Sequence, residues 1–178
     1  MRVLETERLR LVPWEPAHGG MLARLGALPE VMRFIGDGAL WTAAEAEEHS
    51  ARALAHWRAH GFGWRAAVER ESGRLAGLIA LNFAGPDVQE LADDDYELGW
   101  WIDPARWGRG YATEGGRAIR DEALGLGAPS VVARIHPDNA ASARVAAALG
   151  LAPETDAVGR FGQPVRIHRL MAGAVVPG

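Results

Sequence analysis

The sequence predicts a mixed α/β or α+β domain built around one central sheet. Two observations support this prediction. Strand-length apolar segments and helix-length amphipathic segments are interspersed along the chain, which is the pattern expected when helices cover a sheet. The chain also has 178 residues, 48% of them hydrophobic, which is enough for one domain with a substantial core. Because no linker, repeat or shift in composition divides the sequence, we expect a single domain over residues 1–178.

The N-terminal third is predicted to contain one strand and three helices. Alternating apolar residues indicate the strand, and two signals mark the ends of the last helix. Thr42 followed by Glu45 matches a capping box, and Gly61 is the residue type that ends helices in the left-handed conformation. In order, the expected elements are a strand at 7–13 and helices at 16–28, 29–35 and 42–60.

The rest of the chain is predicted to be richer in strands. A short turn between the first two of these strands indicates an antiparallel hairpin, and a run of β-branched residues indicates a later, buried strand. The longer of two helices has an apolar stripe formed by Gly116, Ile119, Ala123 and Leu126. The expected elements are strands at 62–69, 75–83 and 96–103, a helix at 111–126, a strand at 130–135, a helix at 139–150, and strands at 155–160 and 164–173.

The composition excludes several kinds of chemistry. There is no cysteine, so disulfides, thiolate metal sites and a cysteine nucleophile are absent. All 19 basic residues are arginine, so no lysine can form a Schiff base or a Walker-type phosphate contact. The net charge of -4 disfavours general nucleic-acid binding. Without a signal-peptide pattern or an apolar run near the roughly 18 residues of a membrane span, we expect a cytoplasmic protein with no membrane partner. We also expect no metal cofactor.

The segment "RWGRGYATEG", residues 106–115, predicts an anion site. It follows a strand and opens a helix near Tyr111. The first amides of a helix lack internal partners and lie at the positive end of its dipole, while Gly108 and Gly110 allow a ligand to approach the backbone. Arg106 and Arg109 add positive charge. This arrangement suits a phosphate or pyrophosphate.

Two familiar phosphate-binding motifs fit this glycine-rich segment less well. A Walker P-loop needs a lysine, which the chain lacks. A dinucleotide-binding fingerprint needs a third glycine where this sequence has Thr113. A tight turn with solvated arginines remains the purely structural alternative, and an unrelated type of nucleotide-binding protein remains a functional one.

Longer motifs identify a family resemblance. The segments "YELGWWIDPARWGRGYATEG" (96–115) and "ARIHPDNAASARVAAALGL" (133–151) resemble the GNAT superfamily of acetyl-CoA-dependent N-acetyltransferases. The resemblance is closer to the branch of RimJ and RimL, the ribosomal-protein N-terminal acetyltransferases, which "ETERLRLVPW" and "WTAAEAEEH" also fit. It implies the GNAT fold, a mixed and mostly antiparallel twisted sheet of about seven strands flanked by helices, with a splayed strand pair that holds acetyl-CoA.

The resemblance also implies how acetyl-CoA is bound. Backbone amides of residues 108–113 would hold the pyrophosphate of coenzyme A, and the backbone of residues 100–102 would hold the pantetheine arm. Asn139 matches a cofactor-contacting residue of the family and can also cap the following helix. The implied cofactor-binding residues are Trp100, Trp101, Ile102, Trp107, Gly108, Arg109, Gly110, Tyr111, Ala112, Thr113, Asn139 and Ser142.

The chemistry needs a base, a polarised carbonyl and a stabilised leaving sulfur. We expect Glu97 to be the base, with His168 as an alternative and with a structural role for Glu97 as the other interpretation. A backbone amide near residues 101–102 could polarise the carbonyl. Many GNAT enzymes place a tyrosine acid seven residues after the asparagine, but this chain has Ala146 there. The resemblance to RimL-like enzymes instead implies that Ser142 acts on the departing sulfur.

The acceptor is predicted only as a class, an amine. The segments expected to line its pocket contain Phe34, Trp41 and residues 160–166, and Asp93–Asp95 could attract a cation or be a solvated loop. Trp57 is expected in the core. A protein N-terminus and a small amine, such as a polyamine or aminoglycoside, both remain open. A GNAT-fold module that binds acyl-CoA without turnover is the alternative function, and exposed strand edges would suit a homodimer.

Overall fold

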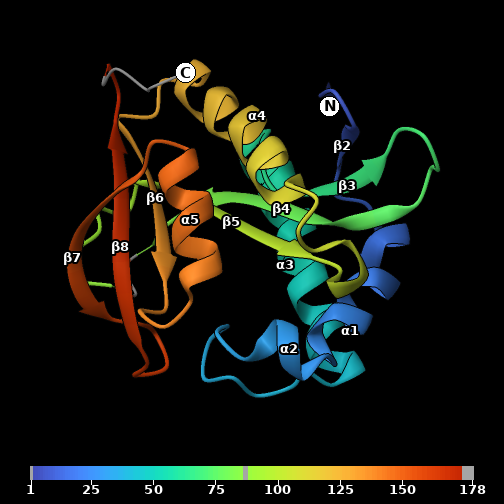
Figure 1. Cartoon of the computed structure of the whole chain (residues 1–178), viewed down its shortest axis with the longest axis horizontal. Helices are drawn as coiled ribbons and strands as arrows, with labels where there is room; N and C mark the ends of the chain where they lie inside the picture. Colours follow the sequence, from blue (N-terminus) through green and yellow to red (C-terminus); the bar gives the residue numbers. More distant parts are fainter. Residues whose placement is uncertain (1, 86–87, 174–178) are drawn as a thin grey trace.

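The fold is one twisted sheet with helices on both faces (Figure 1). The computed structural model describes residues 2–85 and 88–173. In these ranges the sheet has eight strands in the order β1-β2-β3-β4-β5-β6-β8-β7. The strands are β1 (Leu4–Glu5), β2 (Leu9–Pro13), β3 (Arg65–Glu69), β4 (Leu75–Phe83), β5 (Tyr96–Ile102), β6 (Ser130–Ile135), β7 (Ala152–Val158) and β8 (Pro164–Met171).

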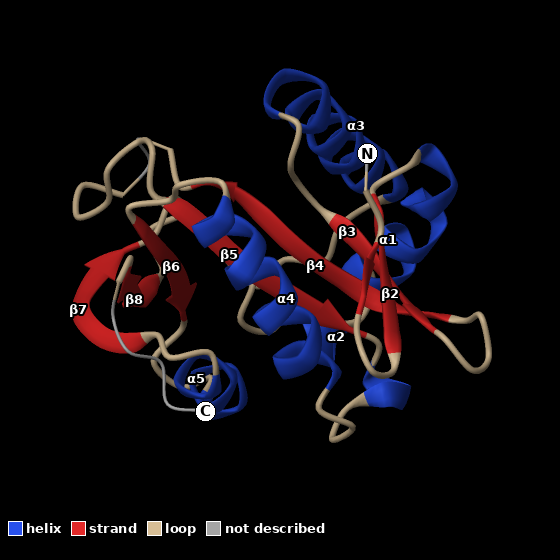
Figure 2. Cartoon of the chain, turned by 90° about the horizontal axis from the view of Figure 1, so that it is seen from above, coloured by secondary structure: helices blue, strands red, loops and turns tan. Residues whose placement is uncertain are grey.

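The helices form two layers, best seen in the view from above (Figure 2). Helices α1 and α3 cover one face over β3 and β4, and α4 and α5 cover the other. The helices are α1 (Gly19–Gly26), α2 (Pro29–Met32), α3 (Ala43–His60), α4 (Tyr111–Gly125) and α5 (Ala140–Ala148), with short 3-10 turns η1 (Pro16–His18) and η2 (Pro104–Arg106).

The end signals of α3 act as the sequence predicts. The Thr42 hydroxyl accepts a hydrogen bond from the Glu45 amide at 3.2 Å, and the Glu45 carboxylate accepts one from the Thr42 amide at 2.7 Å. Gly61 ends the helix with a φ of 75°. In the predicted stripe of α4, however, Leu126 is 51% exposed, because the helix ends at Gly125 and the next residue turns away from the core.

Two other differences concern the number and ends of the strands. The sheet has an eighth strand, β1, which the sequence did not indicate because two residues are too few to show alternation. The weak strand expected at 155–160 begins earlier, at Ala152, and ends at Val158. In the predicted loop 84–95, residues 86 and 87 lie outside the described residues.

Near the centre of the sheet, β5 and β6 pair at one end and then separate. Strand β5 pairs with β4 along its whole length, from Tyr96 to Ile102, and β6 pairs with β8 along its whole length. The two strands are parallel to each other, and their pairing stops at Glu97 and Val132. Each strand therefore stays with its antiparallel partner while the two halves of the sheet diverge, as the GNAT resemblance implied.

A glycine on β4 allows this strand to approach the end of β5 closely. Gly77 lies opposite Ile102 with a φ of 151°, and a Cβ on Gly77 would lie 2.1 Å from the carbonyl oxygen of Trp101. Any side chain at this position would therefore push away the end of β5 that borders the cleft between β5 and β6.

Replacing Gly77 with alanine is expected to lower the free energy of unfolding by about 1–3 kcal/mol, because the clash is with backbone and cannot be relieved by a rotamer change. Chemical denaturation measures the effect. The matched control is Gly20→Ala on α1, where a Cβ would meet nothing within 4 Å. That variant should be as stable as the wild type or up to about 1 kcal/mol more stable. Equal stability of the Gly77 variant and the wild type would contradict the prediction.

Candidate active site

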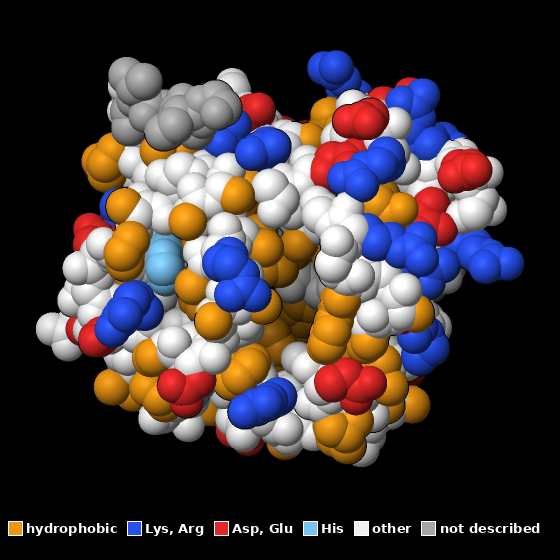
Figure 3. Space-filling view, viewed as in Figure 1, with side chains coloured by type: hydrophobic (Ala, Val, Ile, Leu, Met, Phe, Trp, Pro, Cys, Tyr) orange, Lys and Arg blue, Asp and Glu red, His pale blue; other side chains and the backbone are white. Residues whose placement is uncertain are grey.

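Two cavities meet where β5 and β6 diverge. The first has a volume of about 600 Å³ and lies between the loop after α2, α3 and the turn from β7 to β8. The second has a volume of about 610 Å³ and lies between α2, the loop before α4 and α5. In the space-filling view it is the apolar hollow near the centre (Figure 3). The residues that line both cavities are Phe34, Ile35, Trp100, Trp101, Asn139 and Ser142.

The second cavity contains the start of α4. Gly108 and Gly110 have φ values of 75° and 77°, which are conformations that glycine adopts without strain. Gly110 is the N-cap of this 15-residue helix, so the next amides of the first turn have no acceptor within the helix. Tyr111, Ala112 and Thr113 line the cavity, so the geometry expected of an anion site is present.

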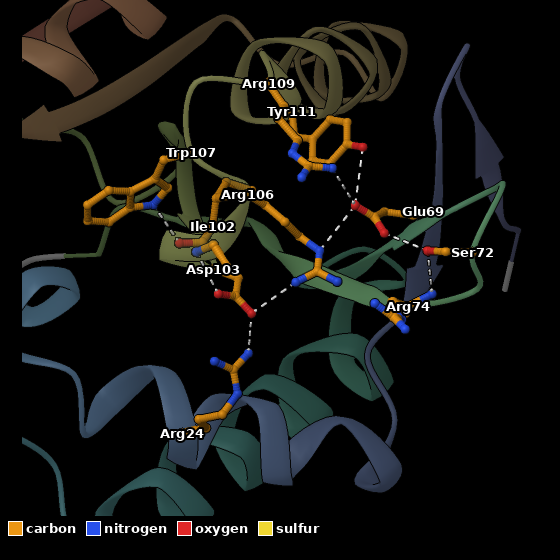
Figure 4. A network of polar contacts seen from close by, with 11 residues as sticks. Arg24, Glu69, Ser72, Arg74, Ile102, Asp103, Arg106, Trp107, Arg109 and Tyr111 are labelled. Atoms are coloured by element: carbon orange, nitrogen blue, oxygen red, sulfur yellow. Dashed lines mark hydrogen bonds and ion pairs between the residues drawn. The ribbon is translucent and has the colours of Figure 1, made fainter.

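A buried carboxylate on β3 holds this loop in place (Figure 4). Glu69 accepts hydrogen bonds from Arg106 Nε at 3.1 Å and from the Tyr111 hydroxyl at 3.2 Å. The Ser72 hydroxyl donates to its other oxygen at 2.5 Å, and Arg109 lies 3.7 Å away. The hydrogen bond from Ser72, and then the charge of Arg106, lower the pKa of Glu69 against the opposing effect of burial.

Two further carboxylates fix the ends of the same loop. Asp103 accepts from Arg24 of α1 at 2.6 Å and from Arg106 at 3.3 Å. Glu114 accepts from Arg8 Nε at 2.7 Å, and Arg8 also donates to the carbonyl oxygen of Arg109 at 2.8 Å. Sequence reasoning missed Glu69 and Arg8, because each lies far along the chain from the motif that it holds.

The two arginines that were expected to add positive charge to the loop, Arg106 and Arg109, both lie against carboxylates. Arg106 is occupied by Glu69 and Asp103, so its charge is already balanced. Arg109 is the one predicted cofactor residue that does not line either cavity, and its half-exposed side chain points toward Glu69. Arg144 on α5 lines the second cavity, is exposed, and has no ion pair or hydrogen bond within the part of the chain that the structure describes. The sequence motif contained Arg144, but nothing marked it as free.

The first turn of α5 carries the predicted polar residues. The Asn139 side chain caps the helix by accepting from the Ser142 amide at 3.1 Å, which confirms its expected capping role. The Trp100 indole donates to the Ser142 hydroxyl oxygen at 3.2 Å across the cleft. Ala146 is fully buried one turn further along, at the position where many GNAT enzymes have tyrosine.

Glu97 lines the first cavity close to the point where the strands part. Both of its oxygens accept hydrogen bonds from Arg134 on β6, at 2.6 Å each. The neighbouring Tyr96 packs instead among Phe62 and Phe83 on the opposite side, as strand alternation predicts. The structure thus places Glu97 at the expected position and adds an arginine that holds it.

The histidines divide between the core and the site. His168 lies outside the linings of both cavities, and burial lowers its pKa, so it is poorly placed as a base. It faces away because it alternates on β8 with Val165 and Ile167, of which Val165 lines the first cavity. His136 on the loop before α5 lines the first cavity, with its ring 5.2 Å from that of Phe34.

The remaining wall of the first cavity is aromatic and charged. Trp41 stacks on His49 at 3.8 Å and lies 4.9 Å from the ring of Trp101. Arg160 and Phe161 from the β7–β8 turn, which belong to the segment predicted to line the acceptor pocket, complete the wall.

Asp95 and Trp57 lie outside the linings of both cavities, and for Trp57 this agrees with the core position that the sequence predicted. Asp95 does not attract ligand, because it is buried and bound to Ser130 at 2.6 Å and Arg169 at 2.8 Å. Trp57 is in the core, where its indole donates to the Trp64 carbonyl oxygen at 2.6 Å.

Comparison with known families decides what these cavities belong to. Residues 8–152 match the model of the acetyltransferase (GNAT) domain, which covers most of the chain. The chain belongs to the GNAT acetyltransferase family.

Relatives of this GNAT domain share its fold over nearly the whole chain. A crystal structure of an acetyltransferase from Agrobacterium tumefaciens superposes with a TM-score of 0.80 at 29% identity, over 96% of this chain and 94% of that one. RimL, a ribosomal L7/L12 alpha-N-protein acetyltransferase in complex with coenzyme A, has a TM-score of 0.77 at 16% identity, over 98% and 100% of the two chains. At that identity the likeness to RimL concerns the fold alone.

A curated relative of this GNAT domain comes from Aspergillus fumigatus. It is named FsC-acetyl coenzyme A-N(2)-transacetylase and is 32% identical over 153 residues, which are 83% of this chain. The present chain spans 64% of the length of that relative.

GNAT acetyltransferases use acetyl-CoA, and the second cavity of this one fits that molecule. It combines helix amides without an acceptor in the helix, the exposed Arg144, and the edge of β5 beyond Glu97, where β6 no longer pairs with it.

Among residues 2–85 and 88–173, no cluster of three or more His, Cys, Asp or Glu side chains could hold a metal ion. In those same ranges, no helix is both long and apolar enough to cross a membrane.

The loop network makes a pH-dependent contribution to stability. Because folding lowers the pKa of Glu69, its contribution is present above the ordinary glutamate value of about 4.3 and is lost as the pH falls through the lowered pKa. We expect Glu69→Gln to be less stable than the wild type at neutral pH, with a difference that shrinks in acid. Denaturation from about pH 3 to 7 measures this. Exposed Glu71→Gln is the control, and a Glu69 difference independent of pH would refute the assignment.

Proposed function

We propose that this protein is an N-acetyltransferase that transfers the acetyl group of acetyl-CoA to a primary amine by direct attack. The observation that supports the proposal most strongly is the pair of cavities that meet at Trp100, Trp101 and Ser142. Two substrates can enter from opposite sides and bring their reacting atoms together there. Absence of cysteine agrees with transfer that uses no thiol on the protein.

The second cavity is the better site for acetyl-CoA. Helix amides at Tyr111–Thr113 and the guanidinium of Arg144 suit its phosphates. The edge of β5 beyond Glu97 offers backbone groups to an extended arm, as a further strand would. Acetyl-CoA supplies an activated acetyl thioester at this junction.

The first cavity then receives the acceptor amine. Glu97 lies at its inner end and can take the proton that the amine must lose, directly or through water. The bidentate contact with Arg134 fixes the orientation of the carboxylate, and its oxygens keep further lone pairs for a second partner. An amide of β5 near Trp101 can polarise the carbonyl, and the Ser142 hydroxyl can donate to the leaving sulfur.

The proposed acceptor is a primary amine, as in the RimJ and RimL branch. Two relatives support a nitrogen acceptor by name: the Aspergillus transacetylase, whose name gives N(2), and RimL, whose name gives the alpha-nitrogen of a protein. The aromatic side chains of Phe34, Trp41 and Phe161 offer a broad apolar contact surface beside the reacting end.

Ligand-induced stabilisation tests the cosubstrate. Acetyl-CoA and CoA should raise the melting temperature, whereas NAD and ATP at equal concentration should not, because a ligand at about 100 times its Kd stabilises the folded state by roughly 2.7 kcal/mol. Thiol release is then measured with a polyamine, an aminoglycoside and a short peptide with a free N-terminus. Stabilisation without thiol release from any amine would favour the non-catalytic acyl-CoA-binding module, and stabilisation by NAD or ATP alone would reject the proposal.

Replacing Glu97 with glutamine tests the base. The variant keeps the size of the side chain but cannot accept the amine proton, so kcat should fall about 100-fold or more while acetyl-CoA still raises the melting temperature. Steady-state thiol release measures kcat. Glu47→Gln on the exposed side of α3 lies outside both cavities and should retain full activity. An unchanged kcat in Glu97→Gln would mean that Glu97 only anchors Arg134.

A further inference from the structure

One hydrogen bond crosses the junction of the two cavities. The backbone of Trp100 pairs with Ile79 of β4, so β4 fixes its position on the side of β5 away from the cleft. Its indole N–H extends to the Ser142 hydroxyl oxygen at 3.2 Å, although the two residues are 42 positions apart. The bond therefore links the sheet on one side of the cleft to the first turn of α5 on the other.

This bond controls what the Ser142 hydroxyl can do. A serine hydroxyl has one proton to donate and two lone pairs that accept. Trp100 can only donate, because an indole nitrogen has no free lone pair, so it occupies a lone pair of the oxygen. Throughout the described chain, the Ser142 hydroxyl has no other hydrogen-bond partner. Its proton is therefore available to a third group.

The rest of α5 keeps this geometry in place. The Asn139 cap holds the Ser142 amide, which fixes the backbone from which the hydroxyl projects. A hydrogen bond accepted by an oxygen also polarises the proton that the same oxygen donates, so the indole makes the hydroxyl a stronger donor.

We propose that Trp100 is a positioning residue, which directs the Ser142 hydroxyl proton toward the sulfur that leaves acetyl-CoA. This inference rests on the proposed function and assigns a role to the Trp100 side chain beyond any contact made by its backbone. Because Ala146 stands where a tyrosine acid is common in the family, stabilisation of the sulfur would depend on this pair.

The transfer balances without a further reagent. The amine nitrogen forms a bond to the acetyl carbon, the carbon–sulfur bond breaks, and its electron pair remains on sulfur. The proton that nitrogen loses passes to Glu97 and then to solvent, and the thiolate takes a proton from solvent. Ser142 remains protonated throughout, because it contributes only a hydrogen bond to the developing negative charge.

A double-mutant cycle tests the pair. Single-turnover rates of acetyl transfer are measured for the wild type, Trp100→Phe, Ser142→Ala and the double variant, using whichever of the three test amines the wild type acetylates. Each single change should slow transfer by about 10- to 100-fold, as expected for one hydrogen bond to a charged group. The double variant should be no slower than Ser142→Ala, and KM for acetyl-CoA should not change.

Different results would separate a positioning role from a structural one. If Trp100 only bridged the cleft, its loss would raise KM for acetyl-CoA and would slow the Ser142→Ala background as much as the wild type, which would overturn the proposal. A Trp100→Phe variant as fast as the wild type would overturn it too. Failure of the proposed function gives a distinct result, because then the wild type itself transfers no acetyl group.

Matched variants control for stability. Trp64→Phe removes another half-buried indole hydrogen bond, to Asn82 at 3.1 Å, outside both cavities, so its transfer rate should equal that of the wild type. Ser142→Thr keeps the hydroxyl and should recover most of the rate lost in Ser142→Ala. If Trp100→Phe does not fold, Trp100→Leu, which also lacks the N–H, takes its place in the cycle.

Discussion

The divergence of β5 from β6 is the constraint on which the rest of the site depends. Both strands satisfy their backbone groups through long antiparallel pairings with outer neighbours, so they can part beyond Glu97 without the sheet coming apart. Parting exposes backbone donors and acceptors on β5, which need a partner other than β6. The close approach of Gly77 to the far end of β5 helps to fix that strand while its other edge stays open. Both cavities exist because of this gap.

A second constraint on the site comes from ion pairs that hold the loop before α4. Glu69 belongs to β3, whereas Asp103 and Glu114 lie at the two ends of the loop, and each of the three carboxylates binds at least one arginine. These contacts rigidify the turn into α4 but also balance the arginines that the motif contains. Attraction for phosphate is then left to the helix amides and to two exposed arginines of the second cavity, Arg33 and Arg144, so the proposed site would attract anions through oriented dipoles and exposed cations.

The two sides of the cleft contribute different chemistry to one point. The sheet presents Glu97, fixed by Arg134, and α5 presents Ser142, contacted by Trp100. In the proposed reaction, one side handles the proton of the incoming amine and the other handles the charge of the departing sulfur. Because the groups belong to separate elements, their spacing is set by how the helix packs on the sheet and by the hydrogen bond between them.

The sequence by itself determined the elements and the loop, because these depend on local patterns. The capping box at Thr42, the strands β4 and β6, the glycine turn before α4 and the Asn139 cap all result from neighbouring residues. Short β1 gave no periodic signal. Only the tertiary structure decided which charged side chains lack a partner, which histidines line a cavity, and that Glu69 anchors the loop before α4. Those properties depend on contacts between residues tens of positions apart, whose side-chain directions and distances no local pattern specifies.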